Sequence, residues 1–558
     1  MQKLCLQCQT QFEITDDDLN FYDKISPVFA GKKYLIPPPT LCPNCRQIRR
    51  LFPVNEINLY KRKCDATGKE ILSNYHPAWP YVIYDQEYWW SDKWDALSYG
   101  RDFDFSRPFF EQLHELSLIV PRYNLFTGYL YDENCDYTNA AGKNKNCYLI
   151  FDSDYCRDSY YSYSINHTTN CLDSYRLRES ELCYENIDCK TCYNCRYVQN
   201  SSSSSDSAFL DNCNDCKKCF MCFNLQHKEY FIYNKQSTKE EYEKLMAQLS
   251  SRQNVEKFKQ EFQKLKEQHV KKYMHGIQNE NVSGDYLANC KNVFESFDCN
   301  EAWDCRYIYQ SWGSQIKDSM DFNECGDFAE LIYESSSCGY NINRISFSMG
   351  ILDQCSNITY CYRCHWSSDL FGCVGLKRKK YCILNKQYSK EEYEKIVPKI
   401  IEHMKKNGEF GEFFPAFMMP HGYNETLAMD YAQLTKEEAL KKGYKWLDED
   451  KKKVPQTCAV PDDIKDVPAS ITKEILACEN CQSNFKIISQ ELKFYQQQNI
   501  PIPKKCFKCR HYARMRQRNP RKLWSRACAK CQAPIQTTYA PNKPETVYCE
   551  ACYLNEVY

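Results

Sequence analysis

Small and apolar residues recur at every third position between residues 135 and 222. All twelve cysteines of this stretch fall in that register, and serine, threonine, isoleucine or leucine fill most of the rest of it. Aspartate, lysine, arginine and tyrosine crowd the other two registers. Because a strand in an ordinary sheet repeats every two residues, one inward row beside two outward rows predicts a parallel β-solenoid.

A second cysteine-rich block, residues 284–387, looks like a tandem copy of the first block, residues 131–236. Both blocks run into similar tails, NKQSTKEEYEK and NKQYSKEEYEK. The cysteines of the second block occupy more than one phase, which predicts insertions. Thr238 with Glu241 and Ser389 with Glu392 are capping boxes, so a helix is predicted to begin after each block. The first helix is expected to continue to about Tyr273, and a shorter helix is expected between Thr435 and Gly443.

Pairs of cysteines separated by two residues occur near both ends of the chain. Two such pairs a few tens of residues apart can place four thiolates around one Zn²⁺, so three zinc ribbons and three zinc ions are predicted. The expected ligand sets are Cys5, Cys8, Cys42 and Cys45; Cys478, Cys481, Cys506 and Cys509; and Cys528, Cys531, Cys549 and Cys552.

The two ends also match each other at a constant offset, which predicts a duplicated module. Cys42, Arg46 and Arg50 correspond to Cys506, Arg510 and Arg514. The last ligand set corresponds to Cys64, Thr67, Asp85 and Tyr88. One thiolate and one carboxylate do not make a structural zinc site, so this ribbon is predicted to have kept its fold and lost its metal, with nearby aromatic residues packing in its place.

Composition places the chain in a reducing compartment. It has 36 cysteines, a mean hydropathy of −0.69 and 73 basic against 73 acidic residues. The opening residues are polar and no apolar run reaches the length of a membrane span, so a cytoplasmic protein without a membrane partner is expected. Zero net charge gives no global reason to expect a nucleic-acid partner.

The charge is unevenly distributed, because residues 470–558 hold fifteen Lys and Arg against six Glu. The densest basic stretch follows a cysteine knuckle and contains a tryptophan, a combination that can hold a phosphate backbone and stack a base. These candidate nucleic-acid contacts are Arg510, Arg514, Arg516, Arg518, Arg521, Lys522, Trp524 and Arg526. The alternative is a face that neutralises the zinc thiolates and packs against the acidic solenoid.

Other motifs allow more than one interpretation. The aromatic residues of the segment 86–112 could stack bases or sugars, but a cap over an open solenoid end is favoured. The run from Cys213 to Cys222 differs from the ferredoxin pattern, which favours a ladder of small buried thiols over a cluster or a zinc site. No hydrolase, kinase or metalloprotease signature is present, so no catalytic residue is predicted.

The segments KRKCDATGKEI, YWWSDKWD, NKQYSKEEYEK, LTKEEALKKGYKW and RNPRKLWSRACAKC resemble a cysteine-rich zinc-ribbon family of candidate-phyla (Patescibacteria-type) bacteria. The resemblance covers nearly the whole chain and implies a bacterial cytoplasmic protein with zinc at the twelve cysteines named above. It implies no activity.

These patterns predict a mainly β protein with two tandem solenoid-like blocks, duplicated zinc ribbons at both termini and helical linkers. The expected divisions are an N-terminal ribbon region (1–100), a helical connector (101–130), a first solenoid block (131–236), a charged helical linker (237–283), a second solenoid block (284–387), a helical linker (388–465) and a C-terminal double ribbon (466–558). The first functional hypothesis is a non-enzymatic zinc protein that binds RNA or a ribonucleoprotein through its ribbons, with the solenoids as spacer and docking surface. The alternatives are a protein–protein scaffold whose ribbons are structural caps, and a thiol or metal buffer.

Overall fold

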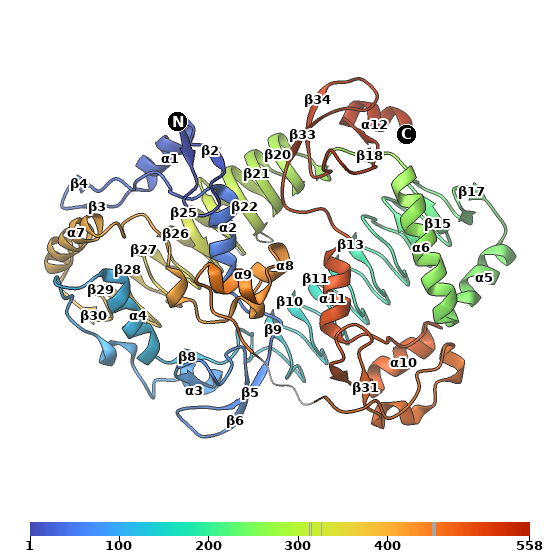
Figure 1. Ribbon diagram of the computed structural model, residues 1–558, viewed down its shortest axis with the longest axis horizontal. Coiled ribbons are helices and arrows are strands. Elements are labelled where there is room, and N and C mark those ends of the chain that lie inside the picture. The colour runs from blue at the N-terminus through green and yellow to red at the C-terminus, as the bar shows by residue number, and fades with distance from the viewer. Residues whose placement is uncertain (312, 314, 325, 449–452, 558) are drawn as a thin grey trace.

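Parallel β-strands dominate the computed structural model, which describes residues 1–311, 313, 315–324, 326–448 and 453–557. Two long ladders of short strands lie side by side, and the two ends of the chain pack around them (Figure 1). We call residues 139–236 the first ladder and residues 276–387 the second ladder. None of the helices in this described part combines the length and apolar character that a membrane span needs.

The strands of the first ladder pair in parallel at a separation of twelve residues, except for the closing antiparallel pair at Phe231 and Gln236. Phe151 pairs with Tyr163, Tyr163 with Tyr175, and Tyr175 with Ile187. Four three-residue steps therefore make one turn of the ladder. Its strands are β9 (Asn139–Gly142), β10 (Phe151–Asp154), β11 (Tyr163–Asn166), β12 (Tyr175–Arg178), β13 (Ile187–Lys190), β14 (Ala208–Asp211), β15 (Phe220–Phe223), β16 (Phe231–Ile232) and β17 (Lys235–Gln236).

A left-handed backbone conformation explains the three-residue period. Every third residue from Lys143 to Tyr233 has a positive φ, and each of these residues directly precedes an inward position. Asn146, for example, has a φ of 54° and precedes the buried Cys147. A residue in this region turns the chain sharply, so each step bends the strand around a narrow interior that cysteine, serine, isoleucine and leucine side chains fill.

The interior cysteines, serines and threonines hydrogen-bond the backbone at these corners. The Cys156 thiol contacts the carbonyl oxygens of Asp154 at 3.3 Å and Ile165 at 3.4 Å. At an equivalent position, the Ser153 hydroxyl donates to the Phe151 carbonyl at 2.7 Å and accepts from the Ile165 N–H at 3.1 Å. A column of small polar side chains thus partners backbone groups that water cannot reach.

The second ladder has turns of unequal length. Its paired residues lie eleven apart at Glu280 and Lys291, fourteen apart at Arg306 and Met320, and thirteen apart at Ala329 and Ile342. When the number of residues in a turn is not a multiple of three, the inward-facing positions of the next turn fall in another phase. The cysteines of this ladder therefore occupy several phases. Its strands are β19 (Gly276–Ile277), β20 (Glu280–Ala288), β21 (Lys291–Asn300), β22 (Ala302–Ser311), β23 (Ile316–Lys317), β24 (Met320–Asn323), β25 (Ala329–Ser336), β26 (Ile342–Ser346), β27 (Ser356–Thr359), β28 (Ser368–Phe371), β29 (Lys380–Ile383) and β30 (Lys386–Gln387).

The helices after the ladders begin at the expected caps. Thr238, Ser389 and Thr435 each form a capping box. The first helix is not continuous to Tyr273, because a 3₁₀ turn at Gln248–Ser250 ends it and Ser251 caps a new helix. These helices are α5 (Lys239–Ala247), α6 (Arg252–Gln268), α7 (Lys390–Lys406), α8 (Ala428–Tyr431) and α9 (Lys436–Lys441).

Each end of the chain packs on the ladder that is more distant in sequence. In Figure 1 the blue α1 (Asp16–Ile25) and α2 (Pro43–Leu51) lie along the second ladder, and the red α11 (Phe507–Met515) crosses the first. The other terminal helices are α3 (Gln86–Trp90), α4 (Phe109–Ile119), α10 (Ser489–Gln497) and α12 (Glu550–Val557). The other paired strands are β1 (Gln2–Leu4) with β2 (Gln11–Glu13), β3 (Val28–Phe29) with β4 (Lys32–Lys33), β5 (Tyr60–Lys63) with β6 (Glu70–Ser73), β7 (Ile83–Tyr84) with β8 (Arg122–Tyr123), β18 (Lys271–Lys272) with β35 (Val547–Tyr548), β31 (Leu476–Ala477) with β32 (Asn484–Phe485) and β33 (Trp524–Ala527) with β34 (Pro534–Thr537).

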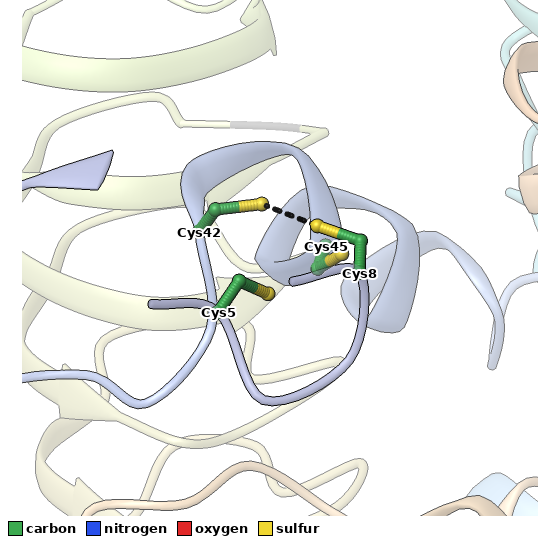
Figure 2. Close-up of side chains that lie close together, drawn as sticks. All are labelled: Cys5, Cys8, Cys42 and Cys45. Atoms are coloured by element: carbon green, nitrogen blue, oxygen red, sulfur yellow. Dashed lines mark hydrogen bonds between the residues drawn. The ribbon is translucent and has the colours of Figure 1, made fainter. Parts of the chain in front are cut away.

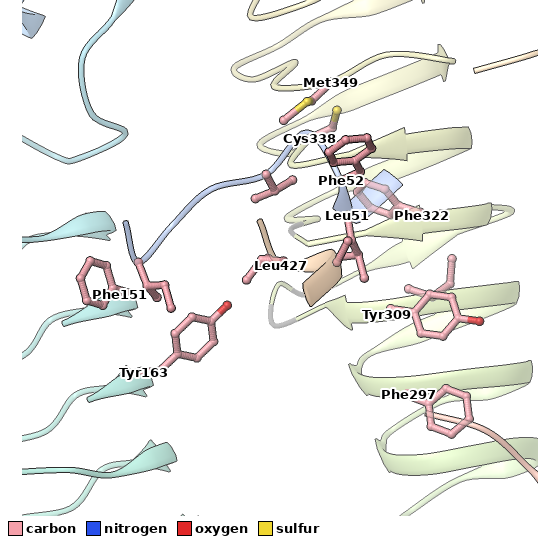
Figure 3. Packing of buried hydrophobic residues seen from close by; sticks show 14 of the residues in the cluster. Leu51, Phe52, Phe151, Tyr163, Phe297, Tyr309, Phe322, Cys338, Met349 and Leu427 are labelled. Carbon is pink, nitrogen blue, oxygen red and sulfur yellow. The ribbon is translucent and has the colours of Figure 1, made fainter. Parts of the chain in front are cut away.

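A shared apolar core joins the two ladders. Leu51 and Phe52 from the N-terminal segment and Leu427 from the connecting segment lie between Tyr163 of the first ladder and Tyr309 of the second (Figure 3). The segment 388–465, expected from sequence to be a helical linker, therefore contributes buried side chains to this core.

The aromatic segment after the first ribbon packs against the last turns of the second ladder. Trp89 is fully buried, its ring centroid lies 5.8 Å from that of His365, and the Lys377 ammonium donates to the Trp89 carbonyl at 2.7 Å. His365 is only 1% exposed, so it is part of this buried contact.

Candidate metal centres and their arginine clamps

The N-terminal cysteines converge on one point from a hairpin and a helix (Figure 2). Cys5 and Cys8 flank a tight turn after β1, and Gln9 closes it with a φ of 59°. Cys42 is the N-cap of α2 and Cys45 lies in its first turn. The four sulfur atoms all lie within 4.8 Å of one another, and Cys8 and Cys42 are 3.6 Å apart.

Two further groups of four cysteines form at the C-terminal end. The turns are closed by Gln482 and Gln532, with φ angles of 61° and 62°. The Cys481 and Cys506 sulfur atoms are 3.7 Å apart, as are those of Cys531 and Cys549. The complete groups are Cys478, Cys481, Cys506 and Cys509, and Cys528, Cys531, Cys549 and Cys552.

The sulfur spacing fits a tetrahedral metal and not a disulfide. Metal–sulfur bonds of about 2.3 Å place tetrahedral sulfurs about 3.8 Å apart, whereas disulfide sulfurs are about 2.05 Å apart. The predicted division of twelve cysteines into three sets of four is confirmed. Four cysteines in tetrahedral geometry suit zinc or iron. In the described part of the chain, the ladder cysteines form no such group.

Hydrogen bonds hold the N-terminal segment at the positions that correspond to the last group of four cysteines. The Asp85 N–H donates to the Cys64 sulfur at 3.3 Å, as the Cys549 N–H donates to Cys528 at 3.2 Å. The Asp85 carboxylate accepts from the Tyr88 N–H at 3.0 Å and so caps α3. Burial raises the pKa of Asp85, but these hydrogen bonds outweigh burial and hold it below its usual value.

Residues 60–73 and residues 524–537 form hairpins with matching registers. Arg62 pairs with Ile71 in the N-terminal hairpin, and Arg526 pairs with Ile535 in the C-terminal one. The following strands, β7 and β35, each pair in parallel with a strand that precedes one of the ladders. The two hairpins and the strands that follow them are therefore arranged alike.

Two arginines of α11 reach a single buried carboxylate of the first ladder. Arg510 and Arg514 each place Nη1 2.8 Å from a different oxygen of Asp173, whose side chain is 0% exposed. Arg510 directly follows the metal-ligand position Cys509, and Arg514 lies one helical turn further on. The four cysteines therefore position the helix that carries both guanidinium groups.

Two arginines beyond α11 join the ladders to each other. Arg518 donates to Asp188 of the first ladder at 2.7 Å and to Asp298 of the second at 2.8 Å. Arg521 also binds Asp298, at 2.8 Å. We call Arg510, Arg514, Arg518 and Arg521 the C-terminal clamp, because their partners belong to both ladders.

The N-terminal ribbon has a matching clamp on the second ladder. Arg46 binds Asp321 at 2.8 Å, and Arg50 binds Asp321 at 3.1 Å and Glu334 at 3.0 Å. All four side chains are at most 2% exposed. Arg46 and Arg50 correspond in sequence to Arg510 and Arg514, and both pairs act at ladder surfaces.

The other predicted nucleic-acid contacts are dispersed. Arg516 and Lys522 are exposed, and the Lys522 ammonium lies 5.2 Å from the centre of the half-buried Trp524 ring. Arg526 donates to the carbonyls of Ala540 and Glu545. Sequence reasoning did not find the acidic partners Asp173, Asp188, Asp298, Asp321 and Glu334, because aspartate and glutamate are common in the outward registers.

Comparison with known proteins adds no assignment. No family model and no curated protein matches the chain. A solved structure assigned as an acetyltransferase from Desulfovibrio desulfuricans G20 aligns over 50% of this chain and 81% of its own, at 8% identity and a TM-score of 0.11. That score is too low to indicate a common fold.

Proposed function

We propose that the chain is a non-enzymatic zinc protein that acts as an interaction scaffold, in which duplicated ribbons hold two β-solenoids side by side. The observation that carries this proposal is the use of ribbon arginines at both ends as internal clamps. Guanidinium groups already bound to buried carboxylates contribute little to a surface for an external phosphate.

Zinc in this proposal has a structural role. The donor set is all cysteine and leaves no position for water or substrate, as in structural zinc sites. Each of two sites fixes the start of a helix whose arginines enter a ladder. Loss of the metal should free that helix, and the buried carboxylates would then face water or unpaired neighbours.

Fewer residues support the RNA hypothesis. Arg516 and Lys522 are exposed, and Lys522 lies over the Trp524 ring, so weak phosphate binding by these residues is the second candidate. A thiol buffer is less favoured, because the cysteines of the first ladder from Cys147 to Cys222 are buried. We further propose a cytoplasmic location and membership of the bacterial zinc-ribbon family that the sequence resembles.

The two functions make opposite predictions in one experiment. Zinc-loaded protein is titrated with single-stranded RNA at several salt concentrations, beside an Arg516→Ala and Lys522→Ala double variant. The scaffold predicts only binding in the non-specific range, with a Kd of about 10⁻⁴ to 10⁻⁶ M. Binding that is tighter than this and lost in the variant would favour RNA.

A second measurement tests the scaffold directly. Small-angle scattering is recorded with zinc bound and after chelation, and also for Asp173→Asn. The scaffold predicts a compact particle that expands when zinc is removed, with protein partners retained only by the compact form. An unchanged particle after complete removal of zinc would contradict the clamp role.

A further inference from the structure

Two buried arginines lack the acidic partners that the clamp arginines have. Arg122 begins β8 and is 3% exposed, and Arg363 lies between β27 and β28 and is 8% exposed. Among the residues that the structure describes, no carboxylate lies within ion-pair distance of either guanidinium, and the groups that raise the pKa of both, against burial, are tyrosines. Two positive charges are therefore buried without a fixed negative charge.

Aromatic rings surround both guanidiniums. The central carbon of Arg122 lies 3.9 Å from the Tyr81 ring centre and 4.5 Å from that of Tyr362, and Arg363 lies 3.8 Å from Tyr123. A desolvated cation–π contact contributes about 2 kcal/mol, whereas burying an ion costs several kcal/mol. The rings reduce this cost but supply no full counter-charge.

Arg122 has hydrogen-bond donors to spare. Its Nη2 donates to the Ser117 carbonyl at 3.2 Å, but Nε and Nη1 are buried without a partner. A cavity of about 30 Å³ is bounded by Arg122, Tyr362 and apolar side chains that include Leu113, Met349 and Phe414. That volume exceeds the minimum of about 10–15 Å³ for one water molecule, so a single small ion fits.

We propose that this cavity binds one halide-sized monovalent anion, with Arg122 as its main ligand and Arg363 as a second source of positive charge. The cavity is too small for an organic anion, and its apolar wall favours an ion that loses its hydration shell readily. The positive field extends to the neighbouring ring of His421, because burial together with Arg122, Arg363 and Lys445 holds the pKa of His421 well below its usual value.

The first test is unfolding of the full zinc-loaded chain at constant ionic strength, with chloride or bromide replacing gluconate. One site predicts that, above the Kd, each tenfold rise in halide raises the apparent unfolding free energy by about 1.4 kcal/mol. Arg122→Met should lose this dependence, and Arg344→Met, at an exposed arginine, should keep it. Absence of the dependence in the unaltered chain would refute the proposal, as would its persistence in Arg122→Met.

A second test does not require the variant to fold. Crystals of the unaltered chain grown in bromide should give an anomalous peak in the cavity beside Arg122. The competing counter-charge is a phenolate on Tyr362: burial raises the pKa of that phenol, but Arg363 and Arg122 outweigh burial and lower it. An empty cavity together with tyrosinate absorption at neutral pH that disappears in Tyr362→Phe would overturn the anion site.

Discussion

Replacing Asp173 with asparagine tests whether the C-terminal ribbon is held by its clamp. Asp173→Asn keeps the shape of the side chain and removes the charge that Arg510 and Arg514 share. All three side chains are at most 8% exposed. Breaking a buried ion pair by removing one partner costs about 3–5 kcal/mol. Because two guanidiniums lose the same carboxylate, we expect a cost near the upper end of that range.

The assay must report local opening, because a chain of this length need not unfold in one step. Hydrogen exchange of the α11 amides does so. A loss of about 5 kcal/mol should speed exchange by a few thousandfold, and a loss of about 3 kcal/mol by about a hundredfold, since each 1.4 kcal/mol is a factor of ten. The exchange of α2, which packs on the other ladder, should remain nearly unchanged.

The matched control is an ion pair at the surface. Asp23 and Lys33 are 2.7 Å apart, but their side chains are 56% and 42% exposed, so Asp23→Asn should cost at most about 1 kcal/mol. If Asp173→Asn has as small an effect on α11 as Asp23→Asn has on its own surroundings, the clamp argument is wrong. A triple variant with Arg510→Met, Arg514→Met and Asp173→Leu should recover much of the loss, because an apolar replacement leaves no unpaired buried charge.

Three other predictions follow from the same structure. Elemental analysis should find three zinc ions per chain and two in Cys8→Ala, and combining Thr67→Cys, Asp85→Cys and Tyr88→Cys should add a fourth; an unchanged count in either variant would contradict the assigned ligands. In the first ladder, Cys171→Ser should cost less than about 1 kcal/mol in urea unfolding, because serine forms similar bonds at equivalent positions, whereas Cys171→Leu should cost about 1–3 kcal/mol by overpacking; equal costs would argue against a narrow interior. Burial and the charges of Asp152 and Asp430 raise the pKa of Glu324 from 4.5 to about 8, against the Ser337 hydrogen bond and Arg521, so the folded chain holds a proton that the unfolded chain releases. Stability should therefore fall between about pH 4.5 and pH 8, and Glu324→Gln should flatten that slope; an unchanged slope would place the titration elsewhere.

The metal centres could be predicted from sequence because their information is local. A pair of cysteines two residues apart fixes a knuckle, and two knuckles suffice for one tetrahedral site. The three-residue period of the first ladder was visible for the same reason, since each step contains its own corner and its own inward residue. The number of residues per turn could not be predicted, because a strict period of three is compatible with a turn length of any multiple of three residues.

The partners of the clamp arginines could not be predicted. Arg518 and Asp298 are more than two hundred residues apart, and they meet only because both ladders have formed and lie side by side. The basic stretch 510–526 has the composition of a nucleic-acid surface whether its arginines point outward or inward. Only the fold shows that four of them face Asp173, Asp188 and Asp298. The sequence does not distinguish these aspartates from the many exposed acidic residues.

The segment around Cys64 and Asp85 and the last group of four cysteines differ in what fills their interiors. Cys64 still accepts an N–H as Cys528 does, and the Asp85 carboxylate holds the start of α3. Beneath it, Tyr75, Tyr81 and Ile83 form a buried cluster with no metal ligand among its members, whereas the corresponding C-terminal cluster includes Cys528, Cys549 and Cys552. At the C-terminal site the sulfur atoms are part of the small core, while Tyr553 of α12 is bonded to Asn212 and Asn224 of the first ladder. We therefore expect metal removal to loosen the sulfur-lined C-terminal core and to leave the Tyr75, Tyr81 and Ile83 cluster unchanged.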